Sequence, residues 1–475
     1  LKVAPRRDGD WKLAIDSPLV GLESRLPAPL AKDAATELPL HVDIEPEAGP
    51  AQLVSLRAAA LRALLRLASS SDGVVLERGS VSLDDAMPRL PSTPGLAIRG
   101  RVARFDLAAL LALVAATSKG STAALTDLDV EVGMLSFAGQ RFPDVRVSAH
   151  PGDAREVAML LTAPAFTARF DYPGTGAAGP GARLRLDRLR LQGRLDDAQL
   201  PRLGVALPVT GLTVEIGDLE WDGMRLGQVA ARLEPGDRAL RVTQLQATRP
   251  MQDVRATGRC ALETQDCRFR FDIASRDAGT SLRDFGFDAA LGASEARLTA
   301  DVSWPLSAGG GRWISRVAGR VRLDASDGRI AAASGSNPLP LLSFLPLYSQ
   351  HSSHAFPGAE GDAGVTFDAL SGNFALADGF ATTDDLRLVA ADYEVLARGR
   401  IGLNDRDYDQ QLAVLRGSDR LPEPMRRMGA GQRLAAAWLV VRQALLAARG
   451  VNNSRLYRLS GRWESPVIEL DQGPR

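Results

Sequence analysis

The sequence predicts a mostly β protein: an elongated, curled antiparallel sheet with a few short helices and one C-terminal amphipathic helix. Apolar and polar residues alternate with a period of two along most of the chain, in runs of about 6 to 11 residues. Turn residues separate these runs, in agreement with the 45 glycines and 28 prolines. A hairpin-sized pattern also recurs within the chain, which is typical of a repeat-built sheet.

The composition excludes several classes of protein. The chain has 475 residues, and its 57 Lys plus Arg balance its 57 Asp plus Glu, so no overall field favours nucleic acid as a partner. Two cysteines are too few for a disulfide-rich scaffold or a four-thiolate metal site. Aromatic residues make up 5% of the chain, so the apolar face of the predicted sheet must be mostly aliphatic.

The first segment, 1–120, reads as part of this sheet with helical apolar spacing near 53–67 and 107–114. The chain starts at Leu1 with a charged stretch and no apolar signal region, which indicates a piece of a longer or processed protein. The longest apolar runs, 106–117 and 434–441, fall short of the roughly 20 residues that cross a bilayer. We therefore expect no membrane span in this piece.

The second segment, 121–330, contains an internal repeat. Residues 128–145 align without gaps on 212–229, pairing Glu131 with Glu215 and Gly133 with Gly217. Residues 237–262 align on 378–403 in the same way. A Gly-Arg step also recurs late in several strand-like runs, where glycine indicates bends or close backbone approach. Roughly 20 to 25 strands at about 4.8 Å spacing would give a sheet about 100 to 120 Å long.

The last two segments are a linker, 331–365, with a short apolar helix near 339–347, and a second β segment, 366–475. Within the latter, residues 425–463 contain eight arginines and no Asp or Glu, and 432–449 has apolar residues at helical spacing. This predicts a basic amphipathic helix, which either lies on an anionic membrane surface or caps the end of the sheet. Both readings use the same side chains: Leu434, Trp438, Val441, Arg442, Leu445 and Arg449.

The sequence offers little support for catalysis, a metal site or a cofactor. The closest histidines, His351 and His354, lie in a Ser-rich stretch that we interpret as a loop. The motif at 174–179 matches GxGxxG, but a proline and a strand follow it instead of a helix. Asp384 and Asp385, like the acids at 405–409, read as turn or exterior residues. We predict no enzyme activity, no metal and no cofactor.

Cys260 and Cys267 flank six residues with a tight turn predicted near Glu263 and Thr264. Such a turn places the two thiols opposite each other on adjoining strands. A disulfide in an oxidising compartment and a pair of free cross-strand thiols both fit this arrangement.

Four motifs stand in order near the C-terminus: Leu-Ser-Gly-Asn-Phe at 370–374, Thr-Asp-Asp-Leu at 383–386, Gly-Arg-Ile-Gly-Leu at 399–403 and Tyr-Arg-Leu-Ser-Gly-Arg-Trp at 457–463. Their order and spacing resemble the C-terminal region of the YhdP family of AsmA-like proteins. Further similar pieces lie at 21–30, 90–101 and 286–305, so the resemblance covers nearly the whole chain as the later part of a longer protein.

The resemblance implies a repeating β-groove bridge in the periplasm of Gram-negative bacteria. It implies an inner-membrane anchor that this piece lacks, phospholipid acyl chains as cargo, and an outer membrane or envelope protein as partner at the C-terminal end. A groove needs an apolar wall, and ten inward residues are the expected lining: Val130, Val132, Leu184, Leu186, Val214, Ile216, Leu386, Leu388, Val395 and Ile401.

Two other functions remain open from the sequence. The first is a non-catalytic envelope scaffold that docks a membrane partner by strand addition or through its basic C-terminal helix. The second is a repeat-built secreted polysaccharide enzyme, which has carboxylates but lacks an aromatic platform for sugar. Alternation alone does not distinguish a groove from a sheet whose apolar face is covered by a second layer.

Overall fold

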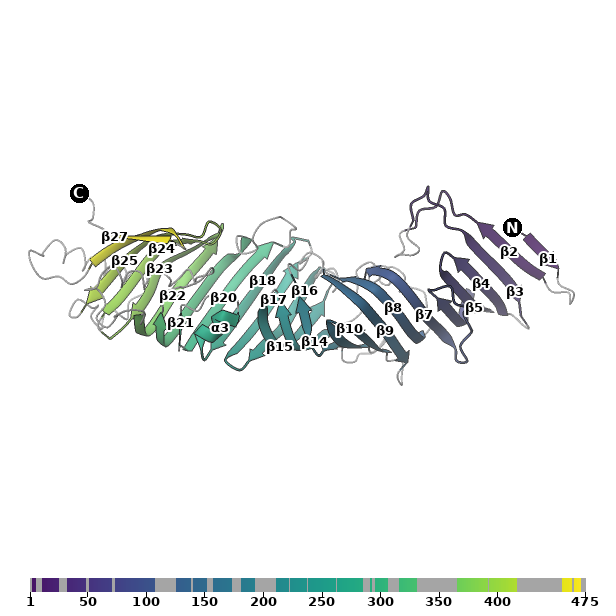
Figure 1. Ribbon diagram of the computed structural model, residues 1–475, viewed down its shortest axis with the longest axis horizontal. Coiled ribbons are helices and arrows are strands. Elements are labelled where there is room, and N and C mark those ends of the chain that lie inside the picture. Colours follow the sequence, from purple (N-terminus) through teal and green to yellow (C-terminus); the bar gives the residue numbers. More distant parts are fainter. Residues whose placement is uncertain are drawn as a thin grey trace, which may run out of the picture. The chain divides into compact units, whose positions relative to one another are not determined.

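The structure is a computed structural model of the 475-residue chain. It describes residues 2–5, 11–24, 32–47, 51–70, 73–106, 125–137, 140–151, 157–172, 181–192, 211–221, 223–236, 238–261, 263–284, 291–292, 295–305, 316–330, 365–391, 393–416, 455–463 and 465–470. In these residues the fold is mostly β with one short helix, as the sequence predicts (Figure 1).

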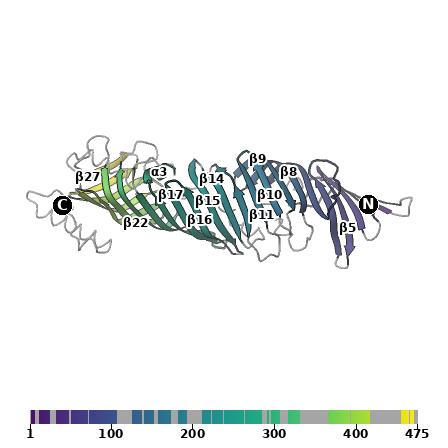
Figure 2. The same cartoon turned by 90° about the horizontal axis from the view of Figure 1, so that it is seen from below.

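The chain forms two compact units, and the first comprises residues 1–222 and 230–240. Its strands are β1 (Lys2–Pro5), β2 (Trp11–Ser17), β3 (Leu40–Pro46), β4 (Ala51–Ala58), β5 (Leu61–Ser70), β6 (Gly73–Ser82), β7 (Gly95–Asp106), β8 (Leu125–Phe137), β9 (Gln140–Pro151), β10 (Val157–Ala163), β11 (Phe166–Tyr172), β12 (Ala182–Leu186), β13 (Leu189–Leu191) and β14 (Leu212–Trp221). Figure 2 shows β8 to β11 side by side in chain order.

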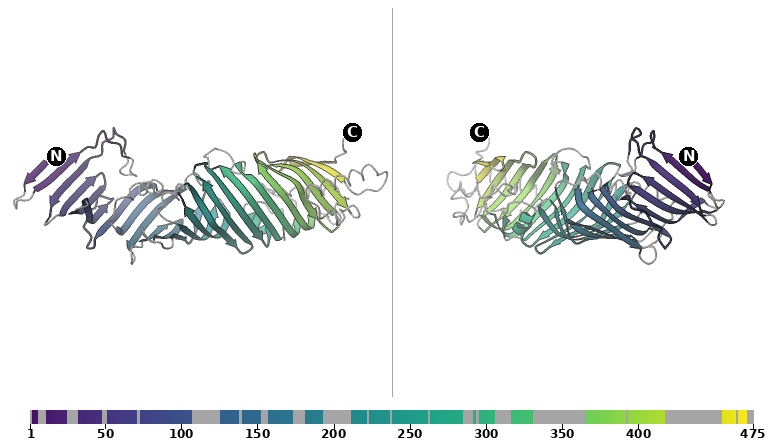
Figure 3. Two further views of the ribbon diagram at one scale, coloured as in Figure 1. Left: turned by 180° about the vertical axis from the view of Figure 1, so that it is seen from behind. Right: turned by 45° about the vertical axis from the view of Figure 1, so that its right-hand side comes forward.

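The second unit comprises residues 223–229 and 241–475. The division between the units therefore falls within β15 (Met224–Pro235) and within β16 (Ala239–Arg249), and each of these strands belongs partly to both units. Its other elements are β17 (Gln252–Ala261), β18 (Asp266–Ser275), α3 (Ala278–Asp284), β19 (Leu291–Gly292), β20 (Glu295–Pro305), β21 (Ala318–Ile330), β22 (Val365–Ala377), β23 (Phe380–Val389), β24 (Tyr393–Gly402), β25 (Asp407–Arg416), β26 (Arg455–Arg462) and β27 (Ser465–Leu470). Figure 3 shows these strands in teal to yellow.

Most neighbouring strands pair antiparallel, but four pairs in the first unit are parallel, contrary to the antiparallel sheet that the sequence predicts. They are β6 with β7, β7 with β8, β12 with β14 and β13 with β14. Parallel strands need a crossover connection of about a dozen residues or more. The connections from β6 to β7, from β7 to β8 and from β13 to β14 are that long. Only a turn-sized step separates β12 from β13, and both of these strands pair with β14. The expected purely antiparallel sheet is thus a mixed one.

The crossover 83–94 runs over the charged face of the first unit. Arg62 and Arg78 point to that face, and they bind the crossover through Asp85 (Nη2–Oδ1 3.3 Å) and the Pro91 carbonyl (3.4 Å). Ser80 and Ser82 lie on the same face beneath it, with 8% and 5% of their surface exposed. Only the first residue of the crossover, Leu83, packs against buried apolar residues of the opposite face.

The helix predicted near 53–67 is wrong, since these residues form the hairpin β4–β5. Ala59 adopts a φ of 49° at the turn between the two strands, so the stretch reverses direction there and does not continue as one helix. Pairing with β3 and β6 on either side overrides the helical preference of the Ala- and Leu-rich sequence. The helices predicted at 107–114, 339–347 and 432–449 lie outside the described residues, as do His351, His354 and 174–179.

The internal repeat corresponds to repeated structure. Its two copies are β8–β9 and β14–β15, and in both copies the first strand pairs with a preceding parallel strand. The aligned glycines Gly133 and Gly217 both lie close to neighbouring backbone. A Cβ at Gly133 would stand 2.9 Å from the carbonyl oxygen of Ala103, and a Cβ at Gly217 would stand 2.5 Å from that of Asp187. Glycine is needed at both positions because of this backbone approach.

The two units differ in how deeply their apolar residues are buried. In the first, a small cluster of eight buried residues around Val132, Val145 and Phe142 is surrounded by partly exposed aliphatic residues. In the second, twenty buried residues form a core over β21 to β26. Both faces of β24 are buried there, since Leu396 and Ala397 are exposed by 4% and 1%.

Candidate functional site

An unbroken row of apolar side chains crosses the first unit. The strand registers place one apolar residue from each of twelve successive strands side by side on one face. We name this row the apolar track; it consists of Ile15, Val42, Leu56, Ala63, Val81, Ile98, Leu128, Ala149, Met159, Phe170, Leu184 and Val214. Eleven strand spacings of about 4.8 Å make it roughly 53 Å long.

A second row runs beside the track over part of the same face. It begins at Gly100 on β7 and continues through Val130, Val147, Leu161, Ala168, Leu186 and Ile216. Because side chains on one face recur every second residue, the two rows lie about 6.8 Å apart. The face between β7 and β14 is thus apolar in both directions.

Most of the apolar track is accessible. Ten of its twelve residues are partly exposed, and only Ala63 and Ala149 are buried, at 6% and 2%. Side chains sealed under a second layer would be buried throughout. The alternative of a fully covered face therefore does not describe this part of the first unit.

The opposite face of the first unit carries paired charges. Each pair joins neighbouring strands, with Nε–Oε2 distances of 2.9 Å for Arg101–Glu131 and 3.1 Å for Arg185–Glu215. Arg99–Asp127 and Arg146–Asp129 extend the series. The pairs keep this face solvated, so the two faces of the sheet have opposite character.

The predicted groove residues of the first unit lie on the apolar face. Leu184 and Val214 belong to the apolar track, whereas Leu186 and Ile216 belong to the second row, and all four are partly exposed. Val130 and Val132 lie on the same face but are buried, at 8% and 3%. The predicted lining omits the track residues Leu56 on β4 and Ala63 on β5, because the sequence predicts a helix in that stretch.

The predicted groove residues of the second unit belong to its core. Leu386, Leu388, Val395 and Ile401 are exposed by 4%, 2%, 4% and 0%. They pack together on β23 and β24 with aromatic and aliphatic residues of β22, β25 and β26. They thus lie within the core of the second unit, and their role as a lipid lining remains a prediction.

The predicted thiol pair forms a disulfide. Cys260 on β17 and Cys267 on β18 are directly opposite, with 4.0 Å between their Cα atoms. The turn 263–265 joins the two strands at the expected place. The bonded form predicted for an oxidising compartment is thus the one in the structure.

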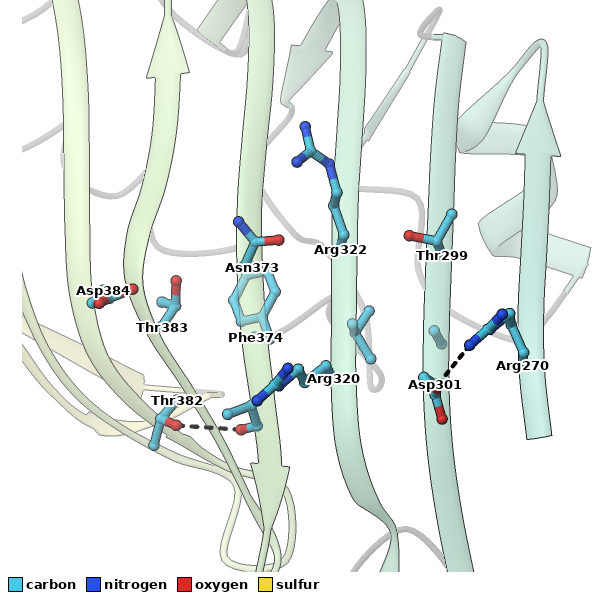
Figure 4. Close-up of a pocket in the computed structure, with 13 residues that line it drawn as sticks. Arg270, Thr299, Asp301, Arg320, Arg322, Asn373, Phe374, Thr382, Thr383 and Asp384 are labelled. Carbon is cyan, nitrogen blue, oxygen red and sulfur yellow. Dashed lines mark hydrogen bonds and ion pairs between the residues drawn. The ribbon is translucent and has the colours of Figure 1, made fainter. Parts of the chain in front are cut away.

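A hollow of about 720 Å³ lies on the charged face of the second unit. Figure 4 shows polar side chains from five neighbouring strands around it, including Arg270, Asp301 and Arg322. Arg270 binds Asp301 (3.2 Å), and Arg322 binds Asp324 (2.7 Å). These charges neutralise each other within the sheet, which suits a solvated face better than a catalytic pair.

The hollow coincides with an irregularity between β22 and β23, whose register shifts there. Asp385 closes the gap by accepting hydrogen bonds from the backbone N–H (2.7 Å) and side-chain amide (2.6 Å) of Asn373. Asp384 and Asp385 thus lie at a bulge within a strand, not in a turn. Asp385 thereby helps to complete the pairing of a bent sheet.

A cluster of titratable residues lies on the charged face of β2 and β3. His41 lies between Asp16 (Nδ1–Oδ1 2.6 Å) and Asp43 (Nε2–Oδ2 3.2 Å), and Lys12 binds Asp43 at 3.0 Å. The hydrogen bond to Asp16, followed by that to Asp43, raises the pKa of His41. Burial raises the pKa of Asp43, but the hydrogen bonds from Lys12 and His41 outweigh it and lower that pKa overall.

In the described part of the chain, no group of three or more His, Cys, Asp or Glu side chains is arranged to hold a metal ion. Among these same residues, the one helix falls well short of the length and apolarity that a membrane crossing requires. The predicted amphipathic residues from Leu434 to Arg449 are outside the described residues.

Comparison with known proteins gives a family but no individual relative. No curated protein and no solved structure matches the chain. The model of one family, described as YhdP protein, matches residues 2–468, which is almost the full length. The AsmA-like motifs, the mostly β fold and this match agree, and the chain belongs to the YhdP family.

Proposed function

We propose that this chain is a non-catalytic segment of a periplasmic bridge that carries phospholipid between the inner and outer membranes. The acyl chains of the lipid lie on the apolar track. The observation that carries the proposal is the unbroken row of partly exposed apolar residues across twelve strands of the first unit. Family membership supports the envelope setting.

The energetic requirement of lipid transfer explains why such a track is useful. A phospholipid with two chains of about 15 methylenes exposes roughly 30 of them in water, at about 0.8 kcal/mol each, or on the order of 25 kcal/mol. A continuous apolar surface removes most of this cost at every position along the path. A single interruption would restore part of it as a barrier, so continuity matters more than any single contact.

The transfer path needs no nucleophile and no nucleotide site in this chain. The protein supplies a surface on which lipids exchange places, and membranes at the two ends supply and accept them. The anchor implied by the family belongs to the inner membrane. The C-terminal end is proposed to meet the outer membrane or an envelope protein.

The direct test is native mass spectrometry of the purified chain, with co-purified phospholipid as the expected result. Transfer of a fluorescent phospholipid between donor and acceptor vesicles then measures function. The sharpest variant pair is Met159→Glu and Leu160→Glu, two neighbours on β10 that point to opposite faces. Met159 lies on the apolar track, whereas Leu160 lies on the charged face and is 44% exposed.

Met159→Glu is expected to reduce bound lipid and transfer, because it places a charge in the path of the acyl chains. Leu160→Glu is expected to leave both unchanged, and circular dichroism should show both variants folded. If neither variant affects lipid and the wild-type chain binds none, the envelope scaffold becomes the better function. Equal loss of transfer in both variants would point to general destabilisation and would contradict the track.

A further inference from the structure

One side of the apolar face of the first unit is closed by packed side chains. Phe142 on β9 and Phe166 on β11 meet edge to face, with 5.1 Å between ring centroids and an interplanar angle of 87°. Both are 7% exposed, and Val145 in the same cluster is 1% exposed. Along β9, Val145 lies four residues from Ala149 of the apolar track, which is about 14 Å. We name the buried residues on this side the closed wall; they are Val132, Leu135, Phe142, Val145 and Phe166.

Two strands extend past the tip of the short β10–β11 hairpin at this wall. Residues 140–145 of β9 lie before the stretch of β9 that pairs with β10. Residues 189–191, which form β13, lie after the stretch of β12 that pairs with β11. Both therefore reach beyond the turn 164–165 of the hairpin, where no strand of the hairpin separates them.

The side chain of Gln140 joins these two stretches. Its amide nitrogen donates to the backbone carbonyl of Gln192 (2.9 Å), and its amide oxygen accepts from the backbone N–H of the same residue (3.1 Å). The two residues are 52 positions apart in the chain, and Gln140 is 8% exposed. Because both backbone groups of Gln192 are bound, the start of β9 and the end of β13 are held together. We name this contact the Gln140 clamp.

A bend in each strand turns apolar side chains towards the wall. Phe142 and Val145 are three residues apart and belong to one cluster, although residues three apart in a regular strand face opposite sides. Asp144 between them has a φ of 51°, which marks the bend. Leu186 and Leu189 are also three apart, and both pack against the same cluster. The wall is thus built from both of the strands that the clamp joins.

The apolar side chains become less exposed from the track towards the wall. Met159 of the track and Leu161 of the second row are partly exposed, whereas Phe166 of the wall is buried. An acyl chain that lies across the two rows meets the wall at its end and gains apolar contact there. A glycerol or phosphate group at the wall would lose its water without a partner, because the Gln140 amide is already engaged with Gln192.

We propose that the closed wall orients phospholipid on the first unit: the methyl ends of the acyl chains meet the wall, and the polar end of the lipid lies away from it. Gln140 is a positioning residue in this arrangement, because it acts through the clamp that holds the wall together. The proposal rests on the proposed function and adds an orientation to it.

The test is photo-crosslinking with two phosphatidylethanolamines loaded onto the chain. One carries a diazirine at the methyl end of an acyl chain, and the other carries it next to the ester. Labelled peptides are mapped by mass spectrometry. The methyl-end probe should label the wall peptides 140–147 and 161–170 several-fold more than the ester-end probe. Equal labelling by the two probes, or the reverse order, would overturn the orientation.

The clamp is tested with Gln140→Leu, which removes both hydrogen bonds and keeps the size of the side chain. Gln192→Leu is the matched control, because Gln192 contributes only backbone atoms to the clamp. Gln140→Leu should bind lipid but lose most of the difference between the two probes, whereas Gln192→Leu should retain it. An unchanged difference in Gln140→Leu would overturn the positioning role. If Gln140→Leu does not fold, Gln140→Asn, which is one methylene shorter, tests the same contact.

The two levels of the proposal fail in different ways. Absence of bound phospholipid in native mass spectrometry of the wild type contradicts the proposed function. Bound phospholipid whose two probes label the wall equally contradicts only the orientation. Circular dichroism establishes that each variant is folded before its labelling is compared with that of the wild type.

Discussion

Arg185 on β12 donates to Glu215 on β14 across a parallel strand pair, with 3.1 Å between Nε and Oε2. The same relationship occurs one repeat earlier, where Arg101 on β7 faces Glu131 on β8. The repeat visible in the sequence is therefore larger than a hairpin. It includes the preceding strand, the crossover and a charged contact between the two.

The repeated glycines should be intolerant of any side chain. Gly217→Ala is expected to lower the free energy of unfolding by about 1 to 3 kcal/mol, because its Cβ would meet the Asp187 carbonyl oxygen at 2.5 Å. Gly133→Ala, with 2.9 Å to the Ala103 oxygen, should cost less. Urea unfolding measures both.

Gly211→Ala is the matched control for these glycines. A Cβ at Gly211 would meet only ordinary contact, the Leu233 carbonyl oxygen at 3.7 Å, so we expect no large change in stability. If Gly217→Ala were as stable as Gly211→Ala, the close parallel pairing of β12, β13 and β14 would be incorrect.

The sequence predicted the mostly β fold, the cross-strand placement of Cys260 and Cys267 and the alternation of faces, because each depends on local pattern. Cys260 and Cys267 flank a short turn, so their pairing follows from neighbouring residues alone. Parallel pairing was missed because alternation is the same in parallel and antiparallel strands. Burial was missed too: Leu184 and Leu388 look alike in sequence, yet one is partly exposed and the other is 2% exposed.

This difference in burial predicts different outcomes for the same substitution. Leu184→Asp should leave the protein folded and reduce lipid binding, because the charge is solvated at a partly exposed position. Leu388→Asp should destabilise the second unit by about 4 kcal/mol or more, because an unpaired charge enters its core. Thermal unfolding and native mass spectrometry together distinguish the two, and a folded Leu388→Asp protein would show that this core opens readily.

The loss of stability on breaking a charged pair should also depend on how deeply the pair is buried. Glu394 is 1% exposed and accepts from Arg387 Nε at 2.6 Å, so Glu394→Ala leaves a cation without its partner and should cost about 3 to 5 kcal/mol. Glu215→Ala, in an exposed pair, should cost about 1 kcal/mol or less. Denaturant titrations of the two variants should differ clearly, and equal effects would argue that Glu394 is solvated.

The cluster around His41 should make stability depend on pH. The pKa of His41 is raised in the folded protein, chiefly by the hydrogen bond to Asp16, so the folded state holds the proton more tightly than the unfolded state. The stabilisation of the folded state by this proton is fully present below pH 6.5, the ordinary pKa of histidine. It is lost as pH rises through the higher pKa of the folded protein. Urea midpoints measured across this range should fall with rising pH in the wild type and change less in His41→Asn.

The lowered pKa of Asp43 acts at the acid end. The stabilisation that the Asp43 carboxylate gives to the folded state is present above pH 3.8, the ordinary pKa of aspartate. It is lost as pH falls through the lower pKa of the folded protein. Asp43→Asn should therefore flatten the acid side of the stability profile. An unchanged acid limb in this variant would mean that Lys12 and His41 do not stabilise the carboxylate.

The disulfide should stabilise the second unit through the short loop that it closes. For a sequence separation of 7, the loop-entropy estimate is about 2 to 3 kcal/mol. Cys260→Ala with Cys267→Ala should lower the free energy of unfolding by that amount, and a reducing agent should lower the wild type equally. The same reductant should have no effect on the double variant. Because ten residue pairs of β17 and β18 already fix the register, the reduced protein should still fold, and loss of folding on reduction would show that the bond, not the strand pairing, organises this hairpin.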